Sequence, residues 1–198
     1  DHFDANGYLP VWTLWGKENN CMIGIHSIPV IADAYLKGFN GFDAERAYNA
    51  IKISQTTNND KSDWSILDKL GYLPYDKIDV ESASRTLEQA YDDFAAFKMA
   101  EAMEKKEDQD FFYKRSQYFK NLFDHETKLM RPKSASGKWL TPFDTFKVSH
   151  ASTSGGNYTE GNAWQYTWHV QQDPEALAEL IGGKEAFVKK LDSLFKLK

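Results

Sequence analysis

The chain has 198 residues, of which 41% are hydrophobic, and its 24 basic and 29 acidic side chains give a formal net charge of −5. This length and composition are typical of one globular domain with its own hydrophobic core, not of a disordered chain. No apolar run approaches the roughly 18 residues that a membrane-spanning helix needs. The acidic balance also argues against nucleic acid as a partner, because contact with phosphate backbones requires a basic face.

Residue counts and motifs further limit the kinds of binding or catalytic site that the chain can contain. Cys21 is the single cysteine, so we expect neither a disulfide framework nor a cysteine-based zinc site. Six Trp, 10 Tyr and 13 Phe suit a site for ligands with flat apolar faces, such as sugars, although core packing explains them equally well. The sequence has no phosphate-binding glycine loop and no Gly-x-Ser-x-Gly nucleophile motif, and its five histidines are scattered.

Apolar side chains recur with the 3.6-residue period of an α-helix along most of the chain. In chain order, we expect helical segments at about 21–37, from 43 onward, 65–70, 82–105, 108–123, 164–169, 174–181 and 184–196. Asp43 and Asp173 are expected to cap helices, the second with Pro174 at the first helical position. Because almost no alternating strand pattern occurs, the predicted fold class is all-α.

Residues 124–158 show no periodicity and form an unusually long connection for a compact domain. Three aromatic residues within it, Trp139, Phe143 and Phe146, suggest that it packs against the rest of the protein. We therefore expect an ordered loop over 128–158 that delivers the segment after it to one end of the helical layer.

The densest group of polar and aromatic side chains follows this loop, over residues 158–168. Glu160 lies where the loop enters a helix, and amide and aromatic residues follow it at helical spacing. Such a mixture offers donors for sugar hydroxyls and flat faces for the ring, but a first-turn acid that complements the helix dipole explains Glu160 equally well. A general acid must stay protonated near neutral pH, so burial among Tyr158, Trp164 and Tyr166 would have to outweigh the helix N-terminus.

Two further groups of residues are less specific. Glu88, Asp92 and Asp93 lie on neighbouring faces of one predicted helix, where a capped helix with solvated acids is the simpler explanation. The stretch from Trp12 to His26, which includes Glu18, reads as a packed corner between a loop and a helix. His26 and Asp33 share a helical face, and a hydrogen-bonded histidine explains this better than a metal ligand does.

Together these clusters resemble glycoside hydrolase family 92, the calcium-dependent exo-acting α-mannosidases. The matching stretches are 7–12 with 18–24, 86–88 with 90–93, 130–133, 158–166 and 182–187. The resemblance covers essentially the whole chain, and the run Glu-Gly-Asn-Ala-Trp-Gln-Tyr at 160–166 is its most specific part.

The resemblance implies an N-terminal β-sandwich followed by an α/α toroid of six helical hairpins. Residues 1–198 would form a single helical segment from the middle of that toroid, with the sandwich and the end of the toroid outside the chain. It further implies an inverting, calcium-assisted enzyme, periplasmic or secreted, that removes terminal α-linked mannose, in the first place α-1,2-linked, from glycans. The calcium ligands and the catalytic base would also lie outside, so no metal ligand is expected here.

By motif match, the resemblance makes Glu160 the general acid. Six further residues are candidates for substrate binding, the last three of them weaker because a structural role explains them as well: Tyr158, Trp164, Gln165, Glu18, His26 and Glu88. Two alternatives stay open at this point, a non-catalytic helical glycan-binding module and a scaffold of helical hairpins. Without its base and metal, the isolated chain is expected to be inactive.

Overall fold

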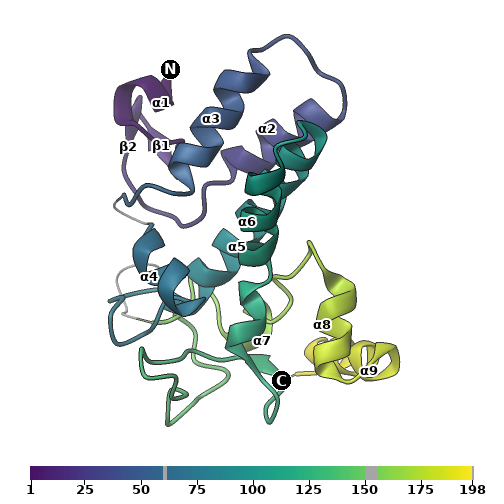
Figure 1. The fold of residues 1–198 in the computed structure, drawn as a ribbon. Helices are drawn as coiled ribbons and strands as arrows, with labels where there is room; N and C mark the ends of the chain where they lie inside the picture. The colour runs from purple at the N-terminus through teal and green to yellow at the C-terminus, as the bar shows by residue number, and fades with distance from the viewer. Residues whose placement is uncertain (60–61, 150–155, 198) are drawn as a thin grey trace.

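The structure, a computed structural model, describes residues 1–59, 62–149 and 156–197. Within them, helices α1 to α9 and a 3₁₀-helix η1 are joined by loops and two antiparallel hairpins, β1–β2 and β3–β4 (Figure 1). The helices span His2–Asn6, Ser27–Leu36, Ala44–Ser54, Trp64–Leu70, Ser82–Ala102, Lys106–Ser116, Tyr118–Leu122 (η1), Ala163–Tyr166, Pro174–Ile181 and Lys184–Leu194; the strands span Thr13–Leu14, Lys17–Glu18, Phe123–Asp124 and Leu129–Met130. About half of the chain is thus helical, as the periodicity indicated, whereas the hairpins were not expected.

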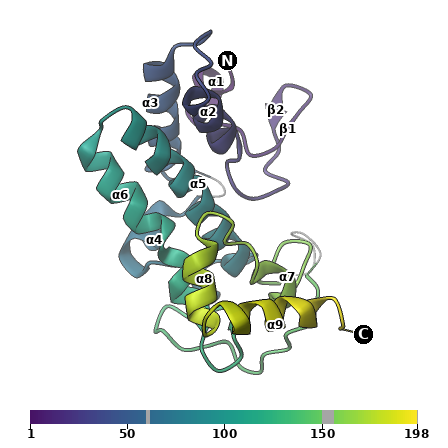
Figure 2. The same ribbon diagram turned by 90° about the vertical axis from the view of Figure 1, so that its right-hand side faces the viewer.

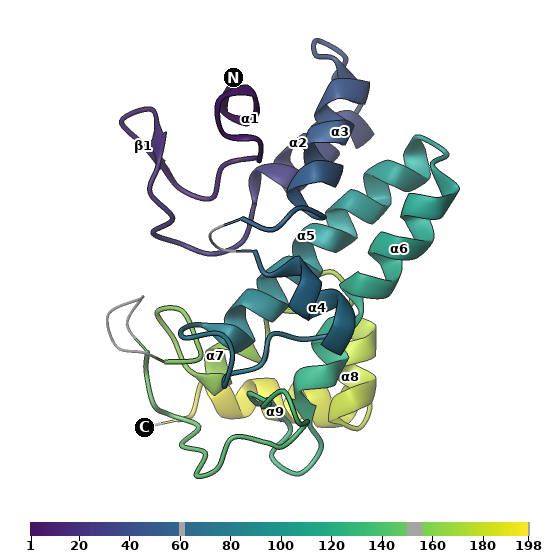
Figure 3. The same cartoon turned by 60° about the vertical axis from the view of Figure 1, so that its left-hand side comes forward.

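Helix α5 is the central element and runs between the N-terminal helices and the C-terminal ones (Figure 3). Fifteen of its 21 residues are buried. Near its end, Ala96 and Met99 belong to a hydrophobic core shared with α2, α3, α4 and α6. Near its start, Ala83 and Leu87 belong to a second core shared with η1, the β3–β4 hairpin, α7 and α8. One helix therefore joins the two cores of the described residues.

Local signals placed several helix ends correctly. The Asp43 side chain accepts a hydrogen bond from the Arg46 amide (3.0 Å) and so caps α3. The Asp173 side chain caps α8 in the same way, with Pro174 at its first position. Both predicted caps are confirmed. They could be predicted from the sequence because a cap depends only on residues within one turn of each other.

Two predicted helices depart most from the structure, and α7 also ends at Tyr166 instead of about residue 169. α2 begins at Ser27 instead of about residue 21, because Gly24 has a left-handed backbone (φ 75°) and the Ile25 amide donates to Asp92. The expected helix 108–123 is split into α6, which ends at Ser116, and the 3₁₀-helix η1.

The long connection after β3 is packed through its aromatic residues, as far as it is described. The Arg131 guanidinium lies 4.8 Å from the centre of the Phe143 ring, and Lys133 Nζ lies 4.1 Å from that of Trp139. Phe146 is 51% exposed but stacks on Trp164 of α7. Trp139 and Phe143 are half-buried, so the expected packing of the loop is found for these two residues, while residues 150–155 lie outside the described part.

The last helix leaves an apolar stripe uncovered. α8 and α9 lie at the end of the structure furthest from α1 to α3 (Figure 2). α9 has no buried residue, and Val188 and Phe195 are 57% and 81% exposed. α9 and its C-cap therefore leave apolar side chains at the surface, while Phe187 packs against Trp168. None of the helices in the described part combines the length and apolarity that crossing a membrane requires.

The two-core arrangement makes a testable prediction about α5. Leu87→Ala should lower the free energy of unfolding by about 2–5 kcal/mol, because Leu87 is fully buried in the second core. Val188→Ala removes a comparable aliphatic group from the exposed face of α9 and should change it by less than about 0.5 kcal/mol. Urea unfolding of the 198-residue chain measures both, and equal losses would contradict the assignment of α5 as the central helix.

Candidate functional site

The segment that carries Glu160 is attached to the N-terminus of α5. The Glu81 amide donates to the Gly156 carbonyl (2.7 Å), and the amides of Ala83 and Ser84 donate to the Asn157 carbonyl (3.1 and 3.3 Å). The first amides of a helix have no partner within the helix itself. Backbone carbonyls of the loop therefore take the place of a capping side chain and fix the loop on the most buried helix.

Thr159 strengthens this attachment one residue before Glu160. Its amide donates to Ser84 Oγ (3.0 Å), and its own hydroxyl lies 2.9 Å from the same oxygen. Both residues are buried, and Ser84 is fully so. The contact joins positions 75 residues apart in the sequence.

Glu160 itself has a left-handed backbone with φ 48°. Such a conformation costs a residue with a side chain of order 1–3 kcal/mol, so it persists only where the surroundings impose it. On the far side, the Gly161 carbonyl accepts from the Ser149 amide (2.9 Å). The strained residue thus lies between two anchored neighbours.

Helix α7 begins directly after this point with a capping box. The Asn162 side chain accepts from the Gln165 amide (3.1 Å), and the Gln165 side chain accepts from the Asn162 amide (3.0 Å). Glu160 therefore lies two residues before the cap and is not a first-turn acid. Its side chain is also exposed, so the described residues do not provide the burial that a general acid at this position would need.

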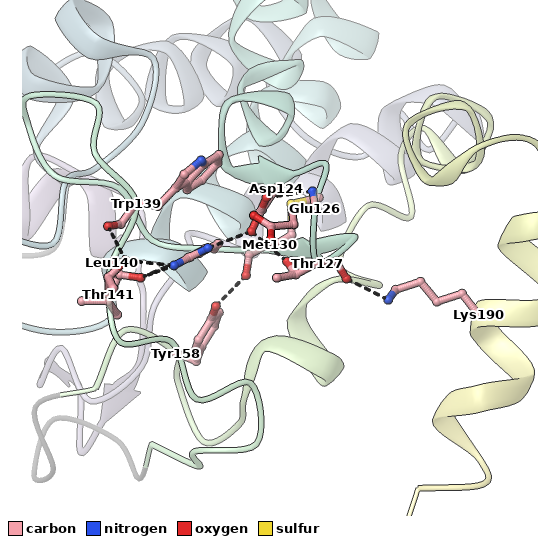
Figure 4. A network of polar contacts seen from close by, with 10 residues as sticks. Asp124, Glu126, Thr127, Met130, Trp139, Leu140, Thr141, Tyr158 and Lys190 are labelled. Carbon is pink, nitrogen blue, oxygen red and sulfur yellow. Dashed lines mark hydrogen bonds and ion pairs between the residues drawn. The ribbon is translucent and has the colours of Figure 1, made fainter.

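Tyr158 anchors the segment before Glu160 to the β3–β4 hairpin and to α7. Its hydroxyl donates to the Met130 carbonyl (2.6 Å), and its ring stacks on that of Tyr166. Figure 4 shows this contact between Tyr158 and Met130. The Arg131 guanidinium, next to Met130 in the chain, pairs with Asp124 (3.0 Å) and donates to the Leu140 carbonyl (2.7 Å). Burial raises the pKa of Tyr158, which keeps its hydroxyl a donor. A role for Tyr158 in substrate binding stays a prediction.

The other two aromatic and amide candidates lie on α7. Gln165 is exposed, and its amide oxygen is already used by the capping box. The Trp164 ring stacks on Phe146, with ring centres 6.0 Å apart, and Lys190 Nζ lies 4.4 Å from its centre. Its indole N–H is buried and has no hydrogen-bond partner among the described residues.

Glu18 organises the N-terminal loop. Its carboxylate accepts hydrogen bonds from four backbone amides at 2.7–3.0 Å, those of Val11, Trp12, Asn19 and Asn20. Burial opposes ionisation, but these amides outweigh it and lower the pKa of Glu18. The carboxylate therefore serves to shape the β1–β2 hairpin.

His26 and two acids of α5 form a second polar group. Its Nδ1 lies 2.9 Å from Asp92 Oδ1, and its Nε2 lies 2.5 Å from Glu88 Oε2. Glu88 also approaches the Tyr166 hydroxyl (3.4 Å) and His169 Nε2 (3.5 Å). These five residues, the His26 cluster, bring together α5, the N-cap of α2, and α7 with the turn that follows it.

Glu88, Asp92 and Asp93 are not solvated, so that interpretation was wrong for these three acids. Glu88 is 8% exposed, and Asp92 and Asp93 are fully buried. Asp93 faces away from the His26 cluster and pairs with Arg115 Nε (2.9 Å). The acids are buried because α5 is enclosed by two cores, and each buried charge has an opposite charge or a donor beside it.

The two histidines of the cluster differ in charge. Burial by itself would lower the pKa of His26, but the hydrogen bonds and charges of Asp92 and Glu88 outweigh it and raise that pKa to about 10. Burial lowers the pKa of His169, and the positive charge of His26 adds to this effect against the attraction of Glu88 and Asp92. Burial also raises the pKa of Asp92 against the influence of His26.

Neither the Glu160 segment nor the His26 cluster forms a metal centre in the described residues. Over residues 1–59, 62–149 and 156–197, no three His, Cys, Asp or Glu side chains are arranged to hold a metal ion. His26, the N-cap of α2, pairs with Glu88 and Asp92, whereas Asp33 pairs with Lys37.

Sequence reasoning missed Ser84, Asp92, Tyr166 and His169 as parts of the site. One signal was present: Glu88 and Asp92 are four residues apart, with small or apolar residues at most nearby positions of α5. Acids one turn apart on a helix that is otherwise buried need a shared partner. The sequence does not show which histidine provides it.

Comparisons with known proteins define the family. Residues 1–198 match the model of the glycosyl hydrolase family 92 catalytic domain. The chain therefore belongs to glycoside hydrolase family 92.

Solved structures agree with this assignment. The chain is similar to a family 92 α-mannosidase from Bacteroides thetaiotaomicron in complex with mannoimidazole, with TM-score 0.89, 39% identity, and coverage of 96% of this chain and 25% of that one. It is also similar to a family 92 inverting mannosidase from the same organism, with TM-score 0.87, 36% identity, and coverage of 97% and 26%. The chain thus spans about a quarter of the length of these relatives.

A fungal relative is more distant. An uncharacterized secreted glycosidase of Arthroderma benhamiae is 26% identical over 98% of this chain and 29% of its own length.

The opposite pKa directions of the two histidines can be observed by NMR. At pH 8, we expect His26 to be an imidazolium and His169 to be neutral, with His26 losing its proton near pH 10. Asp92→Asn should lower the pKa of His26 because it removes the buried negative charge. Chemical shifts of the ring nitrogens report both states, and a neutral His26 at pH 8 would contradict the ion pairs.

The same shift predicts how stability depends on pH. The folded pKa of His26 exceeds its ordinary value of 6.5, so its stabilising contribution is complete below pH 6.5 and is lost as the pH rises toward 10. Between these values, wild type should lose more unfolding free energy than His26→Gln does. Equal slopes in urea unfolding experiments would contradict this.

Proposed function

We propose that the chain is the central part of the catalytic domain of an exo-acting α-mannosidase that removes terminal α-linked mannose from glycans, in the first place α-1,2-linked. Family membership and the two α-mannosidase relatives support this proposal. The observation that carries it is the backbone of Glu160, a strained residue between two anchored neighbours that presents an exposed carboxyl group. Strain of this kind is typical of functional sites.

Glu160 is the proposed general acid of an inverting mechanism. In such a reaction one carboxylic acid protonates the leaving oxygen, while a second carboxylate activates water from the opposite face of the sugar, with the two about 6.5–9.5 Å apart. Glu160 would give its proton to the glycosidic oxygen. The base belongs to a part of the enzyme outside this chain.

The His26 cluster is the proposed polar wall beside this acid. Tyr166 connects the two, since its hydroxyl approaches Glu88 and its ring lies against Gly161, where an added Cβ would come within 3.4 Å of it. The cluster gathers the carboxyl oxygens of Glu88 and Asp92 around the protonated His26. Such a group accepts hydrogen bonds from sugar hydroxyls, a role proposed for Glu88 with His26 holding its orientation.

Calcium is proposed for the complete enzyme and not for these residues. The described part of the chain has no group of side chains that fits the six to eight oxygen ligands calcium prefers. Its ligands are proposed, from the family resemblance, to lie outside the chain.

The same proposal covers the remainder of the protein. A β-sandwich and the other hairpins of an α/α toroid would complete the catalytic domain, and the exposed face of α9 would pack against the next of them. The name of the Arthroderma benhamiae relative supports a secreted or periplasmic location.

Glu160→Gln tests the assignment of the acid in the full-length enzyme. The change is nearly isosteric, so the fold should persist, while turnover of natural mannosides should fall by about 10²–10⁴-fold. Aryl mannosides with good leaving groups need less protonation and should lose much less. Steady-state kinetics on both substrates measures the difference.

Equal losses on the two substrates would assign Glu160 a binding role instead. A non-catalytic glycan-binding module would show no turnover even in the wild-type protein, with retained glycan binding in calorimetry.

The isolated 198-residue chain gives a second test. We expect no measurable mannoside release and no tight calcium binding, because the base and the metal ligands are proposed to lie elsewhere, and each 1.36 kcal/mol of lost transition-state stabilisation lowers the rate tenfold. Isothermal titration with calcium and a mannoside-release assay measure these properties. Turnover comparable to that of a full-length relative would place the base within this chain and overturn the partial-domain proposal.

A further inference from the structure

One buried hydroxyl group adds side-chain contacts to the backbone attachment of the Glu160 segment. Ser84 lies in the first turn of α5 and is fully buried. Its oxygen accepts the Thr159 amide (3.0 Å), lies 2.9 Å from the Thr159 hydroxyl, and is 3.2 Å from the Glu81 carbonyl. All three contacts end on one atom.

These contacts act directly on the residue that precedes the strained position. The peptide bond between Thr159 and Glu160 is planar, so fixing the amide and side chain of Thr159 restricts where the Glu160 backbone begins. The left-handed φ of 48° at Glu160 then directs its side chain away from the buried loop. Without Ser84 Oγ, the buried Thr159 amide would lose the acceptor that the structure gives it.

We propose that Ser84 is a positioning residue for Glu160, which sets the place of the acid through Thr159 without touching the substrate. The inference rests on the proposed function, since it concerns the same proton transfer. Ser84 belongs to α5, the helix that joins both hydrophobic cores. The proposal therefore makes the position of the acid depend on the packing of these cores.

The chain offers a matched control for this hydroxyl. Ser54 is also fully buried; its hydroxyl accepts a distant backbone amide, that of Leu9 (2.8 Å), and donates to the Ala50 carbonyl (2.7 Å). It therefore repeats the hydrogen-bonding pattern of Ser84 at the end of α3, in the first core. Ser54→Ala reports the cost of losing such a hydroxyl where no acid depends on it.

The experiment compares variants of the full-length enzyme on mannosides with good and poor leaving groups. Ser84→Ala should lower kcat by about 10- to 100-fold for poor leaving groups, since a displacement of about 1 Å can cost 10²-fold. With a good leaving group the loss should be less than about threefold, and KM should stay within about twofold. Ser54→Ala should show no dependence on the leaving group.

Changes at Thr159 keep the test valid if Ser84→Ala folds poorly. Thr159→Val removes the hydroxyl but keeps the amide contact, and should give a smaller loss with the same dependence on the leaving group. Thr159→Ser retains both the amide and the hydroxyl contact and should have the kinetics of the wild type. Thermal unfolding of each variant separates loss of fold from loss of position.

The outcomes distinguish the two levels of the proposal. If Glu160→Gln shows a leaving-group dependence and Ser84→Ala and Thr159→Val do not, the positioning role is overturned while the general acid stands. If Glu160→Gln itself lacks that dependence, the proposed acid is overturned and the role of Ser84 with it.

Discussion

The burial of α5 is the constraint from which the rest of the structure follows. A helix enclosed on most of its surface cannot leave its polar groups to water, and a buried polar group without a partner costs roughly 1–3 kcal/mol. Its first amides therefore bind the carbonyls of Gly156 and Asn157, and Asp92 binds His26. Each of these partners comes from a distant part of the chain. The helix thus brings together the segments that carry the candidate site.

The position of the buried charges along α5 explains where this site lies. Glu88 and Asp92 occupy the stretch between Leu87, in one core, and Ala96, in the other. At such a junction the covering side chains change from one set to another, and the His26 side chain there remains 44% exposed. A histidine between two carboxyl groups gives each acid a hydrogen-bond partner in a partly exposed position. The same three residues, His26, Glu88 and Asp92, therefore complete the packing of the helix and supply polar groups for the proposed substrate contact.

The sequence predicted what depends on neighbouring residues and missed what depends on distant ones. The caps at Asp43 and Asp173 and the extent of α5 follow from local patterns, and they were found. Two-residue strands are too short for an alternating pattern to appear, so both hairpins were missed. The pairing of His26 with Glu88 spans 62 residues, and that of Ser84 with Thr159 spans 75. Motif matching indicated Glu160 but gave no reason for its position, which comes from these long-range contacts.

Placement and environment make separate demands on a general acid. Efficient proton transfer requires a carboxyl group that is fixed in space and also held protonated near the working pH, which burial favours. In the described residues Glu160 meets the first demand through its anchored neighbours, while its side chain is exposed. Under the proposed function, the second demand falls to the bound substrate and to the segments that cover this surface in the complete enzyme. Strain at Glu160 is then maintained by the core of this chain, and protonation is controlled by what closes over it.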